Sequence, residues 1–343
     1  MQSKVKYLYH VFVTPNGEVF FCDTYNHRVK KILRTGETVT ICGTGIGGYN
    51  GDDQPATQAQ LKEPSSVFVS SRNEVYISEL AGQRIRKILT NGNIVAVTGD
   101  GTYGYNEDDI PATEARLYNA CGICVNERDE LYFAEYGNNC IRKVCNGMIT
   151  TVVGYTELNT PSGVFISKSN EIYIANNGGH KIKKVNSNGI VSTIAGTGEG
   201  GYNGDGDLAT KTQLSTPWGV TVANDEVYIA DLSNNRIRKV LRNGNIITIS
   251  TIAGTGVDGY NGDGILATSA QLEGPIGLFV TRNNEIFISE YHGHRIRKHN
   301  NWYGQCTIEP FIKKNASSAS IFLRVVSNDI EMTAWIDDQS HTT

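Results

Sequence analysis

Short apolar runs alternate with polar loops along most of the chain, and one stretch shows the basic unit clearly. Alternating apolar and polar residues over four to eight positions are typical of half-buried β-strands. On this basis we predict four successive strands at 66–69, 74–78, 84–88 and 94–97, the last two joined by a tight turn at 90–93. Four consecutive strands with short connections predict one antiparallel sheet.

The central part of this unit recurs six times, at 18–32, 74–88, 130–144, 171–185, 226–240 and 285–299. The residues that close the second strand are separated by steps of 56, 56, 41, 55 and 59 residues. A unit of about forty residues has the length of one four-stranded propeller blade, so the longer steps indicate an insert. The sequence therefore predicts an all-β fold, a six-bladed β-propeller of four-stranded antiparallel blades.

We assign residues 1–314 to this single domain and 315–343 to a C-terminal tail, which is either flexible or the start of a further domain. How the ring closes stays open, because 306–309 and 321–326 both qualify as the fourth strand of blade six. The approximate blade limits are 5–42, 65–98, 121–153, 162–195, 218–253 and 276–314.

One copy of the unit resembles a known family. It contains Pro217-Trp218-Gly219-Val220, then Glu226-Val227-Tyr228-Ile229-Ala230-Asp231, then Asn234-Asn235-Arg236-Ile237-Arg238-Lys239. This pattern is similar to the NHL repeat, and the similarity extends over nearly the whole chain. The resemblance implies a six-bladed propeller of the NHL type.

Four junctions between blades carry nearly identical glycine-rich inserts, at 43–61, 99–117, 196–214 and 254–272. Each begins with Gly-x-Gly-x-x-Gly, but no βαβ unit follows, so a dinucleotide site is not indicated. We predict that the aspartate caps a short helical turn and that the tyrosine and the closing leucine anchor the insert. The recurring tyrosines and aspartates are Tyr49, Asp52, Tyr105, Asp108, Tyr202, Asp205, Tyr260 and Asp263.

A calcium loop is the alternative interpretation of one insert. Asn203, Asp205 and Asp207 have the alternate spacing of calcium ligands, but Leu208 and Leu214 stand where an EF-hand has glycine and glutamate. We therefore predict no metal and no cofactor, and leave calcium binding by these loops open.

The acid that ends each second strand and the arginine that begins the third are predicted to pair across the hairpin. The pairs are Asp23 with Arg28, Glu79 with Arg84, Asp231 with Arg236 and Glu290 with Arg295. Glu135 is the exception, because Cys140 occupies its partner position. Such repeated charges indicate a structural role, since a catalytic group is not expected in nearly every blade.

The inserts and the loops between second and third strands emerge on the same face, which should be heavily built up. Aromatic residues on loops over a rigid scaffold are typical of a partner-binding surface. The junction at 154–161 lacks an insert, and the resulting notch at 155–158 either admits a peptide or is a simple deletion. The predicted partner-binding face consists of Tyr9, Tyr25, Tyr136, Trp218, Ile276, Tyr291 and His292.

The resemblance also bears on catalysis, because a few relatives use a metal in the channel. His27, His180 and His294 occupy equivalent loop positions where other blades have amide residues, so we interpret them as loop caps and not as zinc ligands. No carboxylate is predicted to face the channel. We thus predict no catalytic residues and no enzyme activity.

The predicted function is a non-catalytic binding propeller, a scaffold or sensor module. A protein or peptide partner is favoured and a small ligand stays open; nucleic acid is disfavoured because basic and acidic residues alternate. The alternatives are a hydrolase or lyase with a channel metal site and an RNA-binding NHL domain.

Charge and cysteine content add little to this picture. The net charge is −4, and no run of eighteen apolar residues or signal-peptide pattern is present. Together with seven cysteines, an odd number, this favours a cytoplasmic location and no membrane insertion. Cys121 and Cys124 lie on one predicted strand at a spacing that separates their side chains, so they are not predicted to form a metal or redox pair.

Overall fold

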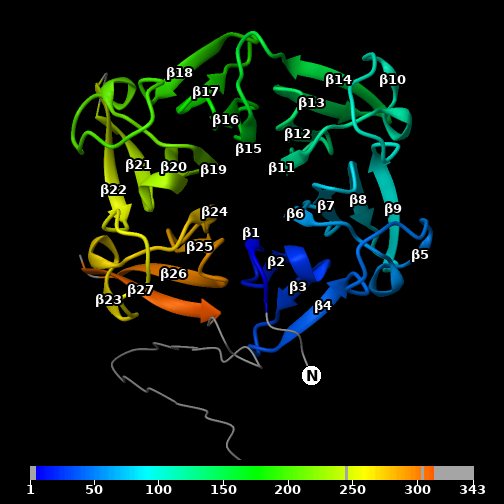
Figure 1. The fold of residues 1–343 in the computed structure, drawn as a ribbon, viewed down its shortest axis with the longest axis horizontal. Helices are drawn as coiled ribbons and strands as arrows, with labels where there is room; N and C mark the ends of the chain where they lie inside the picture. Colours follow the sequence, from blue (N-terminus) through cyan, green and yellow to red (C-terminus); the bar gives the residue numbers. More distant parts are fainter. Residues whose placement is uncertain (1–4, 244–245, 303–304, 313–343) are drawn as a thin grey trace, which may run out of the picture.

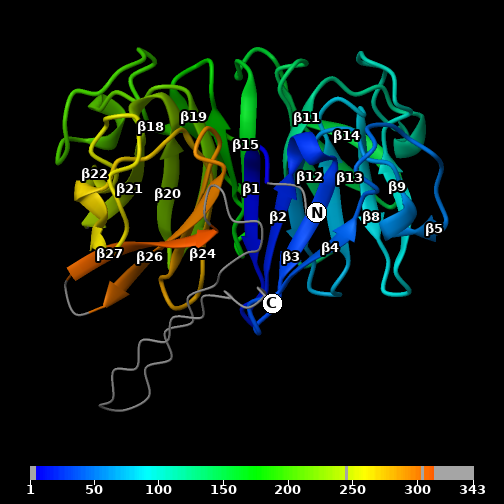
Figure 2. The same ribbon diagram turned by 60° about the horizontal axis from the view of Figure 1, so that its bottom comes forward.

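The computed structural model describes residues 5–243, 246–302 and 305–312. These residues form six antiparallel sheets, arranged as blades around a central channel (Figure 1). The side view shows the strands of each blade running between the two faces of the ring (Figure 2). The predicted all-β, six-bladed propeller is confirmed. The only helices in the described residues are short 3-10 turns.

The first three blades follow one another along the chain, each built from one continuous segment. Blade 1 consists of β1 (Leu8–Val13), β2 (Val19–Asp23), β3 (Arg28–Ile32) and β4 (Thr38–Cys42). Blade 2 consists of β6 (Pro64–Val69), β7 (Val75–Glu79), β8 (Arg84–Ile88) and β9 (Asn93–Thr98). Blade 3 consists of β11 (Ala120–Val125), β12 (Leu131–Glu135), β13 (Cys140–Cys145) and β14 (Met148–Val153).

The second half of the ring repeats this arrangement. Blade 4 consists of β15 (Pro161–Ile166), β16 (Ile172–Asn176), β17 (Lys181–Val185) and β18 (Val191–Ala195). Blade 5 consists of β19 (Pro217–Ala223), β20 (Glu226–Asp231), β21 (Arg236–Asn243) and β22 (Ile246–Ala253). Blade 6 consists of β24 (Pro275–Val280), β25 (Ile286–Glu290), β26 (Arg295–Trp302) and β27 (Gln305–Ile312).

The inserts add a short outer strand to three blades and a 3-10 turn to each of four junctions. The strands are β5 (Gln54–Pro55), β10 (Ile110–Pro111) and β23 (Ile265–Leu266). The turns in the inserts are η2 (Ala56–Gln58), η3 (Ala112–Glu114), η4 (Ala209–Lys211) and η6 (Ala267–Ser269). Two further turns, η1 (Thr24–Asn26) and η5 (Leu232–Asn234), lie between second and third strands.

The hydrophobic core is divided among the interfaces between neighbouring blades. One cluster, for example, joins Phe20 and Cys22 of blade 1 to Val67 and Ile77 of blade 2. Equivalent clusters fill the other interfaces, including the one between blade 6 and blade 1. A propeller buries both faces of each blade in this way, so its second strands can be apolar throughout.

A single hydrogen bond is repeated at every junction between blades. The residue before each third strand adopts the left-handed backbone conformation. Its side chain accepts a hydrogen bond from the backbone N–H of a residue that lies just before the next blade. We call this contact the latch. Its acceptor–donor pairs are His27–Glu63, Gln83–Asn119, Asn139–Thr160, His180–Thr216, Asn235–Gly274 and His294–Tyr7. The interpretation of the three histidines as loop caps agrees with these bonds.

The ring closes without exchange of strands between the ends of the chain. Blade 1 is built from β1 to β4 and blade 6 from β24 to β27, and β1 packs beside β24. The last latch, from the Tyr7 N–H to His294 Nδ1 at 2.8 Å, joins the two blades. Strand β27 contains the predicted strand at 306–309, whereas the alternative at 321–326 and the tail at 315–343 lie outside the described residues.

The inserts agree with the prediction in one respect and differ in another. Each begins beside a loop between second and third strands, as predicted, and then runs along the outer side of the following blade, where β5, β10 and β23 lie at the periphery (Figure 1). Their aspartates do not cap the 3-10 turns, which have no side-chain cap. Each aspartate instead binds a fully buried arginine of the next blade, in the pairs Asp52–Arg86, Asp108–Arg142, Asp205–Arg238 and Asp263–Arg297.

Arg86 shows how an insert is held. Its guanidinium donates to the backbone oxygens of Gly51 at 2.6 Å and Gln60 at 3.0 Å, both in the insert. It also lies 3.8 Å from Glu79 of its own blade and 5.1 Å from the centre of the Tyr49 ring. The arginine therefore links the blade to the insert that covers it.

The predicted ion pairs across the hairpins were mostly wrong. In three of the four pairs the acid contacts the basic residue two positions after its predicted partner. The observed pairs are Asp23–Lys30, Glu79–Arg86 and Asp231–Arg238. Glu135 is no exception, since it pairs in the same way with Arg142. Among the predicted pairs, only Glu290 with Arg295 is found, at 3.4 Å.

The predicted pairs do not form because the first arginine of the third strand contacts the inserts instead. Arg84 donates to the Asp100 backbone oxygen at 2.6 Å, and its guanidinium lies 4.0 Å from the Tyr49 ring centre. The diagonal position across the hairpin is within reach of a long side chain, so Arg86 approaches the acid instead.

The buried acids of these pairs have shifted pKa values. Burial raises the pKa of Glu79, Glu135 and Glu290 to about 7 and that of Asp231 to about 6, while the neighbouring arginines act in the opposite direction.

Candidate functional site: an aromatic ridge over the channel

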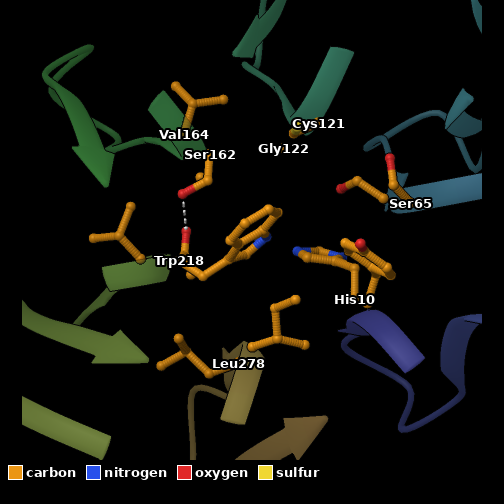
Figure 3. A pocket seen from close by; sticks show the side chains of 14 residues that line it. His10, Ser65, Cys121, Gly122, Ser162, Val164, Trp218 and Leu278 are labelled. Atoms are coloured by element: carbon orange, nitrogen blue, oxygen red, sulfur yellow. Dashed lines mark hydrogen bonds between the residues drawn. The ribbon is translucent and has the colours of Figure 1, made fainter. Parts of the chain in front are cut away.

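The first strand of each blade lines the channel, and side chains from all six blades nearly fill it. A cavity of about 30 Å³ remains, which is room for water and little else. Figure 3 shows His10 and Trp218 pointing into this space from opposite sides. Ser65, Cys121 and Ser162 complete the wall, and Ser162 Oγ donates to the Trp218 backbone oxygen at 2.9 Å.

Six aromatic side chains form a continuous row over one end of the channel. We call this row the aromatic ridge. In order, it consists of Tyr25, Tyr7, Tyr291, Tyr9, Trp218 and Tyr136, with successive ring centres 4.7–5.8 Å apart. The residues come from blades 1, 3, 5 and 6, so only the closed ring brings them together. Aromatic pairs at such distances stabilise each other and form a rigid surface.

Three phenols of the ridge, those of Tyr9, Tyr25 and Tyr291, remain protonated at neutral pH because their pKa values are raised. Burial raises the pKa of Tyr9 and Tyr291 to about 12, and a hydrogen bond with Tyr291 is the main cause of a similar value for Tyr25. Each of these three rings therefore presents an apolar face and a neutral hydroxyl group. Such side chains are enriched where proteins bind other proteins.

The ridge contains five of the seven residues predicted for the partner-binding face: Tyr9, Tyr25, Tyr136, Trp218 and Tyr291. His292 is exposed and its ring lies against Tyr291 at 4.8 Å. Ile276 is 2% exposed and lines the cavity below. Whether these residues bind a partner stays a prediction.

Sequence reasoning missed two residues of this region, Tyr7 and His10. Tyr7 precedes the first strand, and its place in the ridge depends on the latch with His294 and on ring contacts with residues that are distant in the sequence or on another loop. His10 lies on β1 next to Tyr9, in the part of the repeat frame where other blades have small residues such as Ser66 and Gly122. A bulky polar residue at a channel-facing position was the signal that could have identified it.

His10 is uncharged at neutral pH. Burial lowers the pKa of its imidazole to about 4, against the opposing effect of a hydrogen bond at the Val67 backbone. Within the described residues, its Nδ1 atom and the Ser66 hydroxyl oxygen are buried without hydrogen-bond partners. Two unpaired polar atoms in a small cavity can bind water.

The structure gives no support to a metal site in the inserts. The Asn203 side chain crosslinks the insert. Its amide nitrogen donates to the Lys211 backbone oxygen, and its amide oxygen accepts a hydrogen bond from the Gln213 backbone N–H. Asp205 is bound to Arg238 at 2.8 Å. Two of the three candidate calcium ligands thus hold the insert in place. In the described part of the chain, no group of three acidic, histidine or cysteine side chains converges as a metal would require.

The predicted separation of Cys121 and Cys124 is confirmed. Cys121 lines the channel, whereas Cys124 packs in the core between blades 3 and 4. Both cysteines are free and buried. No helix among the described residues is long and apolar enough to cross a membrane.

The fold and the ring of equivalent blades define a six-bladed β-propeller. The NHL repeat family matches residues 214–240, the copy in which the pattern was most evident. Residues 214–240 are thus similar to one NHL repeat and lie in blade 5 of a six-bladed propeller, as the sequence resemblance implied.

Comparison with known proteins adds distant relatives. Teneurin-m of Drosophila melanogaster is 23% identical over 86% of this chain and 10% of its own length. Suppressor of quenching 1, a chloroplast protein of Arabidopsis thaliana, is 30% identical over 24% of this chain and 8% of its own length. The chain thus spans about a tenth or less of these relatives.

Solved structures show the same fold at low identity. A streptogramin B lyase superposes with a TM-score of 0.58 and 15% identity, covering 90% of this chain and 84% of the lyase. A chain of a nidogen/laminin complex gives a TM-score of 0.50 and 16% identity, covering 68% of this chain and 76% of that one. At these identities the likeness concerns the fold alone.

Proposed function

We propose that this propeller is a non-catalytic binding module that holds a partner polypeptide on the aromatic ridge. The observation that carries this proposal is the ridge itself, a rigid row of six aromatic rings across the mouth of a channel that its own side chains fill. The cavity of about 30 Å³ below the ridge is far smaller than the pockets that hold drug-sized ligands, which supports placing a larger partner on top of the ridge. The similarity to a chain of a nidogen/laminin complex supports a role in protein association.

The test combines capture with affinity measurement. The intact propeller is used to capture binding proteins from native cell extract, and each captured protein is then titrated against defined variants. In the ridge variant, Tyr25, Tyr136 and Tyr291 are replaced by alanine, which leaves the channel-filling Trp218 in place. We expect affinity to fall at least about 30-fold, because buried aromatic anchors contribute about 2 kcal/mol or more each.

A matched control replaces three exposed residues of the inserts, Ile46, Tyr103 and Val257, by alanine. These side chains are 62%, 59% and 56% exposed and lie outside the ridge, so affinity should not change. Equal affinities of the ridge variant and the control would contradict the proposal. Thermal unfolding of both variants shows whether the propeller itself is intact.

A second candidate function is a lyase activity in the channel, which would require the side chains around the cavity of about 30 Å³ to move apart and admit a substrate. It is favoured by the uncharged His10 in the channel of a fold shared with streptogramin B lyase. Incubation with a streptogramin B compound would show loss of the intact molecule, and the activity would disappear in His10→Ala. Substrate consumption by both forms, or by neither, would exclude this function.

A further inference from the structure

The outer edges of the six blades differ in whether a segment of an insert pairs with them. In blades 2, 3 and 6 the fourth strand is covered by β5, β10 and β23 respectively, each paired antiparallel to it. In blade 5, Leu208 of the insert forms an antiparallel bridge with Thr248. The sheets of blades 1 and 4 instead end at β4 and β18. The chain thus contains four covered edges and two that it leaves uncovered within the described residues.

The covered edges show which backbone N–H and C=O groups of the fourth strand form hydrogen bonds with the insert. Ile94 lies opposite Ile88, and its carbonyl oxygen accepts the Asp53 N–H at 2.9 Å. Ile249 lies opposite Val240 and uses both backbone groups, accepting from Gly206 at 2.9 Å and donating to Asp207 at 3.3 Å. The residue at this register therefore directs its N–H and C=O outward.

Val191 occupies this register in blade 4. It lies opposite Val185, as Ile94 lies opposite Ile88. No insert runs along blade 4, because the junction before it is the short one at 154–161. The backbone groups that take up an insert in the other blades consequently face outward from β18 without one.

The side chains along this edge also differ from those of blade 1. At the position before Val191, Ile190 is 61% exposed, whereas blade 1 has Glu37 and Thr38 at the two equivalent positions. Polar or charged residues normally protect an uncovered edge from pairing with another chain. Blade 1 follows that rule and blade 4 does not.

Blade 4 already contains an ion pair equivalent to the one that fixes each insert to a covered blade. Lys183 stands where the covered blades have a buried arginine, and its Nζ atom lies 3.2 Å from Glu157 of the short junction. Glu157 thus supplies the carboxylate that an insert aspartate supplies elsewhere. A segment docking on this edge needs to provide only an extended strand.

We propose that β18 is a second docking site, which takes an extended segment of a partner polypeptide as an added antiparallel strand. The chemistry of that segment follows from the four inserts, which place an extended pair of residues, often with isoleucine, leucine or proline, along the edge. The expected partner segment is therefore extended, with apolar residues at the pair that lies along β18. Its backbone N–H groups are directed at the Val191 and Gly189 carbonyls, and one of its carbonyls accepts from the Val191 N–H, as the Asp207 carbonyl accepts from Ile249 in blade 5. This mode is β-strand addition, in which main-chain hydrogen bonds supply affinity.

The chain provides its own probe for this site. A fluorescent peptide with the sequence of residues 104–115, Gly-Tyr-Asn-Glu-Asp-Asp-Ile-Pro-Ala-Thr-Glu-Ala, carries the segment that covers blade 3. Fluorescence anisotropy with the intact propeller should show saturable binding with a Kd below about 1 mM. Amide exchange of Val191 and Thr193 should slow when the peptide is added.

Val191→Pro is the decisive variant. It removes the outward N–H and leaves the hydrogen bonds between β17 and β18 in place, which proline permits only at an edge strand. We expect at least about tenfold weaker peptide binding. Ile190→Asp, which keeps the backbone and removes the apolar side chain, should weaken binding in the same direction. Thermal unfolding confirms that both variants are folded.

The ridge variant separates this site from the proposed function, because it should bind the peptide as the intact propeller does. Absence of saturable binding, or unchanged binding by both edge variants, would overturn the proposal. Sedimentation of the propeller alone gives a further outcome. A dimer that Val191→Pro dissociates would also overturn it, by showing that the occupant is a second copy of this chain.

Discussion

At the scale of single residues, the latch shows that a hydrogen-bonding geometry is kept while the amino acid changes. Histidine, glutamine and asparagine each place one acceptor atom against the same backbone N–H, at 2.6–3.2 Å. The repeat frame was enough to predict a capping role for these residues, because amides replaced histidines at equivalent positions. It was not enough to find Tyr7 or His10, whose surroundings come from blades far away in the sequence.

His10 predicts a specific dependence of stability on pH. Its pKa is about 4 in the folded chain and 6.5 in the unfolded one, so the contribution of the neutral ring is complete above pH 6.5. That contribution is lost as the pH falls from 6.5 towards 4, by up to about 3 kcal/mol. We expect the difference in unfolding free energy between the native chain and His10→Phe to shrink or reverse over this range, measured by denaturant titration.

The comparison with the variant is needed because other groups titrate with the opposite sign. The raised pKa of Glu79 favours the folded chain at low pH, and this contribution is lost as the pH rises from 4.5 towards 7. A difference between native chain and His10→Phe that is constant from pH 7 to pH 4 would refute the prediction.

At the scale of elements, one position predicts whether a blade is covered by an insert. The third residue of the third strand is arginine in the four covered blades and lysine in the two uncovered ones, Lys30 and Lys183. The planar guanidinium of Arg86 or Arg297 contacts two backbone oxygens and a carboxylate at once, which an ammonium group does not match. This correlation was present in the sequence, but its meaning depended on knowing that an insert packs on the next blade.

Arg86→Lys should therefore loosen the insert at 43–61. The variant loses the bonds to the Gly51 and Gln60 oxygens, and we expect a loss of roughly 1–3 kcal/mol in unfolding free energy. Limited proteolysis should cut this insert faster than the other three. Arg72→Lys is the matched control, since the Arg72 side chain is 70% exposed, and it should leave both measurements unchanged. Equal cutting rates of all four inserts would refute this role of Arg86.

At the scale of the whole molecule, the blade count, the strands and the inserts could be predicted from one sequence, because each depends on local periodicity. The register of the ion pairs and the course of the inserts could not, since both are decided by contacts between neighbouring blades. The ridge falls between these cases. Five of its six members were predicted for the partner-binding face, but their continuity depends on the closing of the ring.

Ring closure can be tested by comparing two latches. His294→Ala acts at the closing junction and His180→Ala at an interior one, and each removes one acceptor from a partly buried N–H, at a cost of about 1–3 kcal/mol. If the closing junction is an ordinary interface, both variants lose similar stability in thermal unfolding. Replacement by asparagine, the residue of two other latches, should restore most of the loss. A much larger effect of His294→Ala would contradict this and show that the closing junction depends more strongly on its latch residue than an interior junction does.

Construction of every blade from one uninterrupted segment has a consequence for how such a ring changes over time. A duplication or loss of one genetic segment would add or remove a whole blade with its core faces and its latch, because no strand is borrowed across the seam. The inserts can vary independently of the number of blades. Each insert is present together with a buried arginine in the third strand of the following blade, which binds the aspartate of that insert. Gain of an insert thus requires two matched changes, such as those at Asp52 and Arg86, which are 34 residues apart. Loss of an insert requires a single deletion and leaves the edge of one blade uncovered.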